Sequence, residues 1–473
     1  MPEQPTDTDT ATATNQPLRI AVIGAGPAGI YASDILTKST DPAAAGVTVD
    51  IFDRLPTPYG LIRYGVAPDH PRIKQIIVAL HRVMENPRIQ FFGNVSVGTD
   101  IKLDELRQYY DAVIVATGAE RDRDLPIPGI DLERSHGAAD FVAFYDSHPD
   151  RPQTWDLSGA KEVAVIGVGN VGLDVARILA RTGDELLYTE IPDHVHAVLA
   201  NSAVTDIHMF ARRGPAQAKF TPVELRELDH SPNVQVVVDP QGMEFDEASE
   251  QAITSAKALR MVVDVLSEWA LRDADPNVGR RIHIHFLENP VEVLGADGAV
   301  VGLRTERMEL DGNGGVVGTG THTDWPIQAI YRAVGYRSEP ISDLPFDERT
   351  LVVPNEAGRV ITSSGEPLPG VYATGWIKRG PVGLIGHTKS DAAETVGHLL
   401  SDAPTLPRAP HRSRDDVIAM LASKGLQVTD FAGWDRLDEH ERGLGAADQH
   451  PRERRKVTNR AEMTDIARRG SGA

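Results

Sequence analysis

Short hydrophobic runs and glycine-rich turns alternate along the first half of the chain. Residues 18–23 form an apolar run, glycines follow at 24, 26 and 29, and hydrophobic positions continue to Leu36. This order predicts a strand, a tight turn and a helix. A second apolar run at 47–52 ends at Asp53, and residues 163–179 repeat the first pattern with glycines at 167, 169 and 172. The same strand, turn and helix therefore open two segments of the chain.

A shorter repeat, Ala-Thr-Gly, follows an apolar run at 116–118 and again at 373–375. Each copy closes a segment that begins with one of the glycine turns. This order predicts an α/β fold with two Rossmann-like dinucleotide-binding domains, the second inserted into the first. We expect the first domain at 17–118, the inserted domain at 119–344, and the rest of the first domain at 345–473.

The two ends of the chain have a different composition. Polar residues 1–16 are typical of a disordered tail. Residues 408–473 carry both signs of charge, with helical patterns near 412–424 and 460–468. We expect this last segment to be a C-terminal appendage that wraps the first domain.

Composition and charge narrow the classes of function. The 473 residues carry a formal charge of −20 and contain no cysteine, which excludes disulfide exchange and cysteine-held metal clusters in this chain. If the protein moves electrons, a bound organic cofactor has to carry them. The negative charge argues against nonspecific binding to nucleic acid or anionic membranes. The sequence shows neither a signal-peptide pattern nor an apolar stretch of membrane-spanning length, so we expect a cytoplasmic protein without membrane insertion.

The two glycine turns indicate phosphate binding. In such a turn the first glycine permits the sharp bend, the second lets a pyrophosphate approach the backbone, and the third lets the helix pack on the strand. The pyrophosphate then lies at the positive end of the helix dipole.

The residues at the ends of the next strands suggest which dinucleotide each turn binds. Asp53 is placed to accept hydrogen bonds from an adenosine ribose; a turn cap before Pro56 is the alternative interpretation. Arg212 and Arg213 favour the 2′-phosphate of NADP(H), the alternative being a solvated basic turn. We therefore expect FAD in the first domain and NADP(H) in the inserted one.

Longer motifs resemble one family of flavoproteins. They are residues 58–71 (PYGLIRYGVAPDHP), 167–179 (GVGNVGLDVARIL), 375–386 (GWIKRGPVGLIG) and several positions between 212 and 227. From about residue 18 to near 460 the chain resembles the adrenodoxin reductase-like NADPH–ferredoxin reductases, including their actinobacterial type. The resemblance implies an FAD-dependent oxidoreductase. Such an enzyme takes a hydride from NADPH and passes electrons singly to a ferredoxin-type iron–sulfur protein, reversibly in principle.

The glycine turns and the resemblance together imply two sets of binding residues. The FAD set is Gly24, Gly26, Ala28, Asp53, Leu61, Val97, Gly375, Trp376, Gly383, Leu384 and Ile385. The NADP(H) set is Gly167, Val168, Gly169, Asn170, Arg212, Arg213, Glu224 and Gly383. Asp53 stands where the family often has glutamate, so we expect a looser ribose contact. No metal site is expected.

His70 and Glu227 are the polar side chains that we expect near the reacting rings, where His70 would adjust the flavin potential or proton uptake. The alternatives are a cap or turn histidine before Pro71 and a solvated helix glutamate. Trp376 is expected to pack near the flavin, with an ordinary core position as the alternative. A helix beginning near His387 or Thr388 is expected to point its N-terminus at the flavin and stabilise negative charge there.

An iron–sulfur acceptor requires a docking surface, and ferredoxins are usually acidic. The candidate docking cations are Lys257, Arg260, Arg280, Arg281, Lys378 and Arg379. Two other functions share some of these features: a flavin monooxygenase, which would use oxygen instead of a protein acceptor, and a nonenzymatic NADP(H)-sensing protein.

Overall fold

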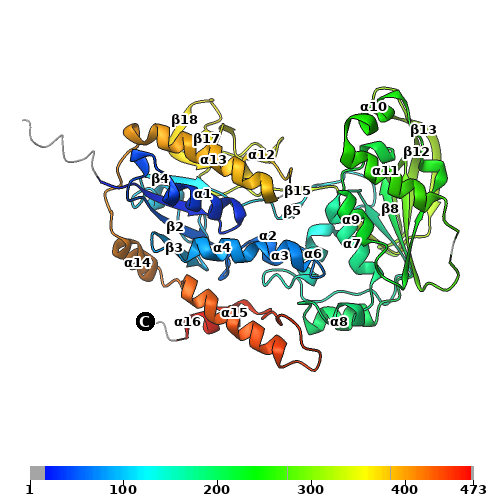
Figure 1. Ribbon diagram of the computed structural model, residues 1–473, viewed down its shortest axis with the longest axis horizontal. Coiled ribbons are helices and arrows are strands. Elements are labelled where there is room, and N and C mark those ends of the chain that lie inside the picture. The colour runs from blue at the N-terminus through cyan, green and yellow to red at the C-terminus, as the bar shows by residue number, and fades with distance from the viewer. Residues whose placement is uncertain (1–15, 274, 384, 470–473) are drawn as a thin grey trace, which may run out of the picture.

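The computed structural model describes residues 16–273, 275–383 and 385–469. Two lobes, each built on a mainly parallel sheet, lie side by side, and the C-terminal helices run along their lower side (Figure 1). Most of the tail predicted at 1–16 lies outside the described residues. Among those that are described, no helix has the length and apolar character that crossing a membrane requires.

The first sheet has seven strands in the order β16-β17-β18-β4-β1-β2-β3. Those from β18 to β3 run parallel, and β17 and β16 continue the sheet antiparallel. The strands are β1 (Arg19–Ile23), β2 (Thr48–Asp53), β3 (Ile89–Gly93), β4 (Ala112–Val115), β16 (Asn355–Glu356), β17 (Arg359–Ile361) and β18 (Pro367–Ala373). Strands β1 to β4 precede the second lobe in the sequence and β16 to β18 follow it, so the predicted insertion of one α/β domain into another is confirmed. The residue boundaries of the domains stay a prediction.

Both faces of the first sheet are covered, which explains why β1 and β4 are buried throughout. On one face α1 (Pro27–Lys38) packs against α4 (Ile76–Met84) and α13 (Ile385–Asp402). On the other face lie α5 (Leu103–Leu106) and α14 (Arg414–Ser423). Three single-turn helices complete the lobe: α2 (Leu61–Tyr64), α3 (Pro71–Lys74) and α12 (Trp376–Arg379).

The second sheet has six strands, all parallel, in the order β6-β14-β7-β8-β10-β9. They are β6 (Ser135–Gly137), β7 (Glu162–Ile166), β8 (Asp206–Ala211), β9 (Val234–Val238), β10 (Arg280–Phe286) and β14 (Ala329–Arg332). Helices of this lobe are α6 (Ala138–Tyr145), α7 (Asn170–Ala180), α8 (Asp193–Ala200), α9 (Pro222–Glu227), α10 (Glu247–Ser255) and α11 (Lys257–Ala270). The opposite face carries an antiparallel sheet of β11 (Glu288–Ala296), β12 (Ala299–Leu310) and β13 (Val316–Trp325).

The two connections between the lobes pair with each other. Strand β5 (Arg121–Asp122) leads into the second lobe, β15 (Tyr336–Arg337) leads back, and they form a short antiparallel ladder. Short 3-10 turns lie at η2 (Pro42–Ala44), η3 (Asp184–Leu186), η4 (Pro215–Gln217), η5 (Pro240–Gly242) and η6 (Ala403–Thr405).

The C-terminal segment contains the two expected helices, α14 and α16 (Arg460–Arg468), and also α15 (Phe431–Ala446), which the sequence pattern did not predict. Helix α15 contains three glycines and many charged residues, both of which weaken a helical pattern. It forms because Trp434 and Leu437 are buried against the first lobe. Tertiary packing therefore decides this helix.

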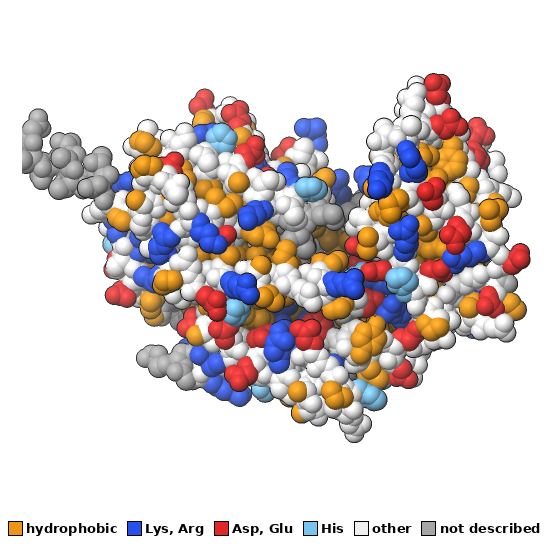
Figure 2. Space-filling model, in the orientation of Figure 1, with side chains coloured by type: hydrophobic (Ala, Val, Ile, Leu, Met, Phe, Trp, Pro, Cys, Tyr) orange, Lys and Arg blue, Asp and Glu red, His pale blue; other side chains and the backbone are white. Residues whose placement is uncertain are grey.

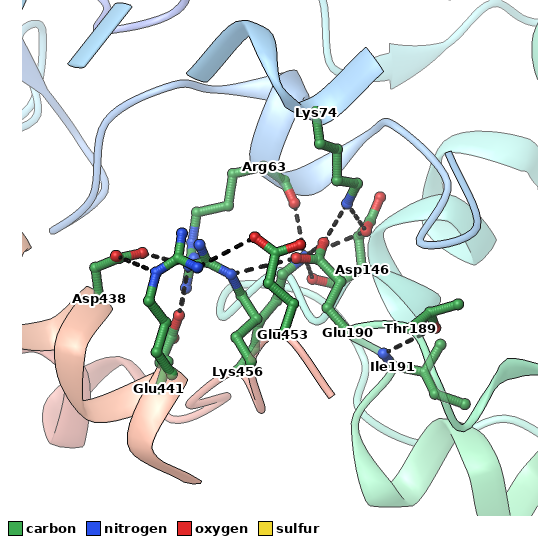
Figure 3. A network of polar contacts seen from close by, with 12 residues as sticks. Arg63, Lys74, Asp146, Thr189, Glu190, Ile191, Asp438, Glu441, Glu453 and Lys456 are labelled. Atoms are coloured by element: carbon green, nitrogen blue, oxygen red, sulfur yellow. Dashed lines mark hydrogen bonds and ion pairs between the residues drawn. The ribbon is translucent and has the colours of Figure 1, made fainter. Parts of the chain in front are cut away.

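The C-terminal segment touches both lobes, whereas the sequence led us to expect contact with the first domain. Lys456 Nζ donates to Arg63 O at 2.8 Å and to Asp146 O at 3.2 Å, and it lies 2.8 Å from Glu190 Oε1. Figure 3 shows this network, in which Arg63 also pairs with Glu441 of α15 at 2.6 Å. These buried charges join residues from the first lobe, the second lobe and the C-terminal segment.

Candidate functional site

A cavity of about 620 Å³ opens at the carboxyl ends of the first sheet. Strand β1 has β2 as its neighbour on one side and β4 on the other, so the strand order reverses at β1. The crevice at this reversal is where open α/β sheets bind ligands. Both Ala-Thr-Gly repeats end here, because β4 and β18 are parallel neighbours, and Ala116, Thr117, Gly118 and Gly375 all line the cavity.

The first glycine turn is built for close approach. Gly24 has φ +108°, and a Cβ there would collide with Ala116 O; a Cβ on Gly29 would collide with Gly24 O. A Cβ on Gly26 would meet nothing within 4 Å. Because Gly26 also lines the cavity, the open space beside it allows the pyrophosphate of a ligand to approach the main chain.

The second glycine turn has the same design. Gly167 has φ +120°, and a Cβ there would collide with Ala333 O. A Cβ on Gly172 would collide with Gly167 O, whereas a Cβ on Gly169 would meet nothing within 4 Å. In each turn the first and third glycines are required by the fold, and the middle one leaves space for a ligand. Val171, one residue into α7, lines the cavity of the first lobe. The second turn therefore adjoins that cavity.

Asp53 lies at the end of β2 and lines the cavity. Its Oδ2 accepts from Ala25 N–H at 2.7 Å and its Oδ1 from Leu55 N–H at 2.9 Å. Asp53 therefore caps the turn before Pro56, as the alternative interpretation expected. Each of its oxygens still has a lone pair for a ribose hydroxyl. Burial, the largest influence, raises the pKa of Asp53 to about 6.

The structure brings together eight of the eleven residues expected to bind FAD. Lining the cavity are Gly24, Gly26, Ala28, Asp53, Leu61, Val97, Gly375 and Trp376. Gly383 does not line the cavity, and Leu384 and the side chain of Ile385 lie outside the described part of the structure. Contact of all eleven with FAD stays a prediction.

Trp376 is half-buried and lies 6.2 Å from Tyr336, measured between ring centroids.

Helix α13 begins at Ile385, so the start expected near His387 or Thr388 was late by two or three residues. Thr388 in its first turn lines the cavity, which directs the positive end of the helix dipole toward this space.

Sequence reasoning did not single out several polar residues of the cavity wall, namely Arg54, Ser96, Glu120 and Tyr336. Of these, Arg54 directly follows Asp53 and pairs with Glu120, so proximity to the strand end was an available signal. Tyr336 comes from the returning connection between the lobes, and no local pattern marks it.

At the second turn, Arg212 and Arg213 of the predicted NADP(H) set directly follow β8, whose Phe210 O accepts from Gly167 N–H at 3.0 Å. Arg212 and Arg213 are exposed, and neither side chain has a hydrogen bond or ion pair to any described residue. Lys219 N–H donates to Val168 O at 3.2 Å, and Asn170 Oδ1 accepts from Thr221 N–H at 3.1 Å. Two free guanidiniums beside an open glycine turn fit a 2′-phosphorylated dinucleotide.

His70, Glu224 and Glu227 form one cluster between the lobes. His70 Nδ1 lies 3.0 Å from Glu227 Oε2, and His70 Nε2 lies 3.0 Å from Asp174 Oδ1. Burial opposes the charge on His70, but the hydrogen bond and charge of Asp174 outweigh it and raise its pKa. Although His70 precedes α3 at the N-cap position, its side chain makes no capping bond. The cluster lies outside the residues that line the large cavity, and its place beside the reacting rings stays a prediction.

Two of the expected docking cations are bound to other residues of this chain. Lys378 is buried and pairs with Asp391 at 3.0 Å and Glu394 at 2.5 Å, so the expectation that it docks a partner was wrong. Arg280 donates to the backbone carbonyls of Leu179 and Arg181. The remaining candidates, Lys257, Arg260, Arg281 and Arg379, are exposed or half-exposed. Figure 2 shows the face of the molecule that is hollowed between the two lobes, with both signs of charge spread over it.

Comparisons with known proteins agree with this geometry. Residues 18–214 match the family model described as pyridine nucleotide-disulphide oxidoreductase. The NADPH-ferredoxin reductase FprA of Mycobacterium leprae is 41% identical over 456 residues, which is 94% of this chain and 98% of that protein. The mitochondrial NADPH:adrenodoxin oxidoreductase of Arabidopsis thaliana is 36% identical over 461 residues, 94% of each chain.

A solved structure gives the same result in three dimensions. The chain is similar to Mycobacterium tuberculosis FprA in complex with NADPH, with a TM-score of 0.88 and 40% identity, over 96% of this chain and 100% of that one. These similarities extend over both lobes and the C-terminal segment. The chain therefore belongs to the family of NADPH–ferredoxin and NADPH:adrenodoxin reductases.

Proposed function

We propose that this protein is an NADPH–ferredoxin reductase that moves electrons from NADPH through FAD to an iron–sulfur protein. The observation that carries the proposal is the position of Val171. This residue belongs to the helix of the second glycine turn and also lines the cavity beside the first turn. Two dinucleotide sites that share a wall allow a hydride to pass directly between their ligands.

The residues of the first lobe fit FAD. Gly26 leaves room for the pyrophosphate, Asp53 accepts from the ribose hydroxyls, and the first turn of α13 directs its N–H groups at the cavity. When bound, FAD accepts a hydride and releases electrons one at a time, which no side chain of this cysteine-free chain can do. The dipole of α13 stabilises negative charge at that end of the cavity.

The residues of the second lobe fit NADPH in preference to NADH. Arg212 and Arg213 have no protein partners among the described residues, so both are free for the 2′-phosphate. Gly169 leaves room for the pyrophosphate at the start of α7. Trp376 and Tyr336, together with Leu61 and Val171, give the shared cavity an apolar wall.

The electron acceptor is an iron–sulfur protein of the ferredoxin or adrenodoxin class. This assignment comes from the relatives named above and from the absence of cysteine, which leaves this chain without a cluster of its own. Because such acceptors are acidic, we expect docking to use the exposed cations and to weaken as salt rises.

The experiment is a coupled assay. The purified, FAD-loaded protein is mixed with NADPH and cytochrome c, with and without a ferredoxin. The proposal requires that ferredoxin accelerate cytochrome c reduction and that the acceleration decrease with salt. Reduction that proceeds equally without ferredoxin, or formation of hydrogen peroxide at the rate of NADPH oxidation, would favour an oxygen-using flavoprotein instead.

A further inference from the structure

The cluster of His70, Glu224 and Glu227 has the geometry of a metal site. One ligand atom from each of the three residues lies within 4.8 Å of the other two. Donors in a tetrahedral zinc site with bonds of about 2.0–2.1 Å lie about 3.4 Å apart. His70 Nδ1 and Glu227 Oε2 are already 3.0 Å apart, so small side-chain movements bring the three atoms onto one ion.

An independent observation is the partner of the other ring nitrogen. His70 Nε2 lies 3.0 Å from Asp174 Oδ1, and Arg177 Nη2 donates to that same oxygen at 2.8 Å and so holds the carboxylate in place. Metal-binding histidines almost always give their second ring N–H to a carboxylate or carbonyl, which fixes the tautomer. Asp174 is placed to accept the proton of Nε2, and Arg177 Nη2 also lies 2.5 Å from that nitrogen. A cation that binds Nδ1 displaces the proton that Nδ1 directs at Glu227.

The surrounding charges favour a dication. Four carboxylates lie around His70, those of Asp69, Asp174, Glu224 and Glu227. Arg177 pairs with Asp69 and Asp174, and Arg181 pairs with Asp69. Glu224 Oε2 is buried and has no hydrogen-bond partner among the described residues. An unpaired buried carboxylate oxygen is costly, and a bound cation would satisfy it.

We propose that His70, Glu224 and Glu227 form a binding site for a divalent cation of the zinc class, and that the bound cation competes with NADPH. Imidazole nitrogen with carboxylate oxygens suits zinc better than magnesium or calcium, which take oxygen ligands. The competition rests on the proposed function, because it takes Glu224 as a contact of NADPH. The binding of zinc does not depend on it.

The binding test is equilibrium dialysis of the FAD-loaded protein against zinc chloride. We expect one zinc ion retained per chain, no comparable retention of magnesium, and affinity weakened about tenfold or more in His70→Gln and in Glu224→Gln. The matched control is His196→Gln, since His196 of α8 pairs with Asp184 at 2.9 Å and is not part of the cluster. Flavin absorbance confirms that each variant is folded. Equal zinc binding by wild type, His70→Gln and Glu224→Gln overturns the site, as does the absence of stoichiometric zinc.

A second arm separates the site from the function. Adding NADP⁺ to the dialysis should raise the apparent Kd for zinc, and zinc should slow NADPH oxidation by wild type more than by Glu224→Gln, each compared with its own zinc-free rate. Zinc binding that NADP⁺ does not weaken contradicts the competition and leaves the metal site standing. Zinc bound by a protein that does not oxidise NADPH at all would contradict the proposed function alone.

Discussion

Asp53 Oδ2 accepts a hydrogen bond from Ala25 N–H at 2.7 Å, which joins the end of β2 to the first glycine turn. One carboxylate thus holds the turn in place and faces the cavity that the turn borders. We expect Asp53→Ala to lose most of its FAD during purification, because both the turn and the ribose contact are weakened. The measurement is the ratio of flavin to protein absorbance. Asp41→Ala is the control, since Asp41 caps only the exposed turn η2; a full complement of FAD in Asp53→Ala would contradict this role.

The middle glycines separate the two dinucleotide sites. Gly26 and Gly169 both have negative φ and open space at the Cβ position, so alanine at either position should fold normally. We expect Gly26→Ala to reduce FAD content, and Gly169→Ala to keep FAD while raising KM for NADPH about tenfold or more, since one obstructed phosphate contact is worth about 1.5–3 kcal/mol.

Gly279 also has open space at its Cβ position, so Gly279→Ala provides a control that should change neither quantity. If Gly169→Ala lost FAD and kept its KM for NADPH, the assignment of the two turns would have to be reversed.

A stack of histidines on β8 and β10 predicts acid sensitivity. The ring of His208 lies 4.6 Å from that of His283 and 5.3 Å from that of His285. Burial, followed by the charge of neighbouring histidines, lowers the pKa of His208 to about 4 and that of His285 to about 3. Because the unfolded pKa is about 6.5, the unfolded chain binds more protons below that pH. The free energy of unfolding should therefore fall between pH 6.5 and 4 by about 1.4 kcal/mol per pH unit for each histidine.

Urea unfolding at several pH values checks this expectation. His285→Gln should flatten the decline, whereas His196→Gln, which alters a half-exposed histidine, should leave the slope unchanged. An unchanged slope in His285→Gln would mean that other groups dominate the acid sensitivity.

The buried charge network under the two lobes predicts a large stability effect. Lys456→Met removes one of the two lysines that pair with both Asp146 and Glu190, the other being Lys74 (Figure 3). Breaking a buried pair by removing one partner costs about 3–5 kcal/mol, and we expect that loss in urea unfolding of the FAD-loaded protein. Lys424→Met, which removes an exposed pair with Glu105, should cost under about 1 kcal/mol. Equal effects of the two substitutions would contradict a structural role for the network.

Much of the fold was predictable because it depends on local signals. At Gly24 and at Gly167 the sequence combines an apolar strand, a bend that favours glycine and an apolar helix. The structure has a strand, a turn and a helix at both places. The repeat at 116–118 and 373–375 also predicted the insertion correctly. Helix α15 could not be predicted, because Trp434 and Leu437 gain their partners from distant parts of the chain.

The candidate site was predictable to the extent that its residues follow strand ends. Asp53 and Arg212 directly end or follow a strand, and the structure places Asp53 in the cavity and leaves Arg212 unpaired. The burial of Lys378 could not be seen, because its pairing with Asp391 depends on how α12 packs against α13. Likewise, the approach of Asp174 to His70 is a contact between lobes, 104 residues apart in sequence.

The most direct test is anaerobic rapid mixing of the FAD-loaded protein with NADPH or NADH, followed by flavin absorbance. Charge-assisted bonds from Arg212 and Arg213 to the 2′-phosphate are worth about 1.5–3 kcal/mol each. We predict that NADPH bleaches the flavin at concentrations about 100-fold or more lower than NADH, and that Arg212→Gln with Arg213→Gln removes this preference. Arg281→Gln, near the start of the neighbouring strand β10, should keep it. Bleaching by NADH at equal or lower concentrations, or a flavin that neither nucleotide reduces, would contradict the account.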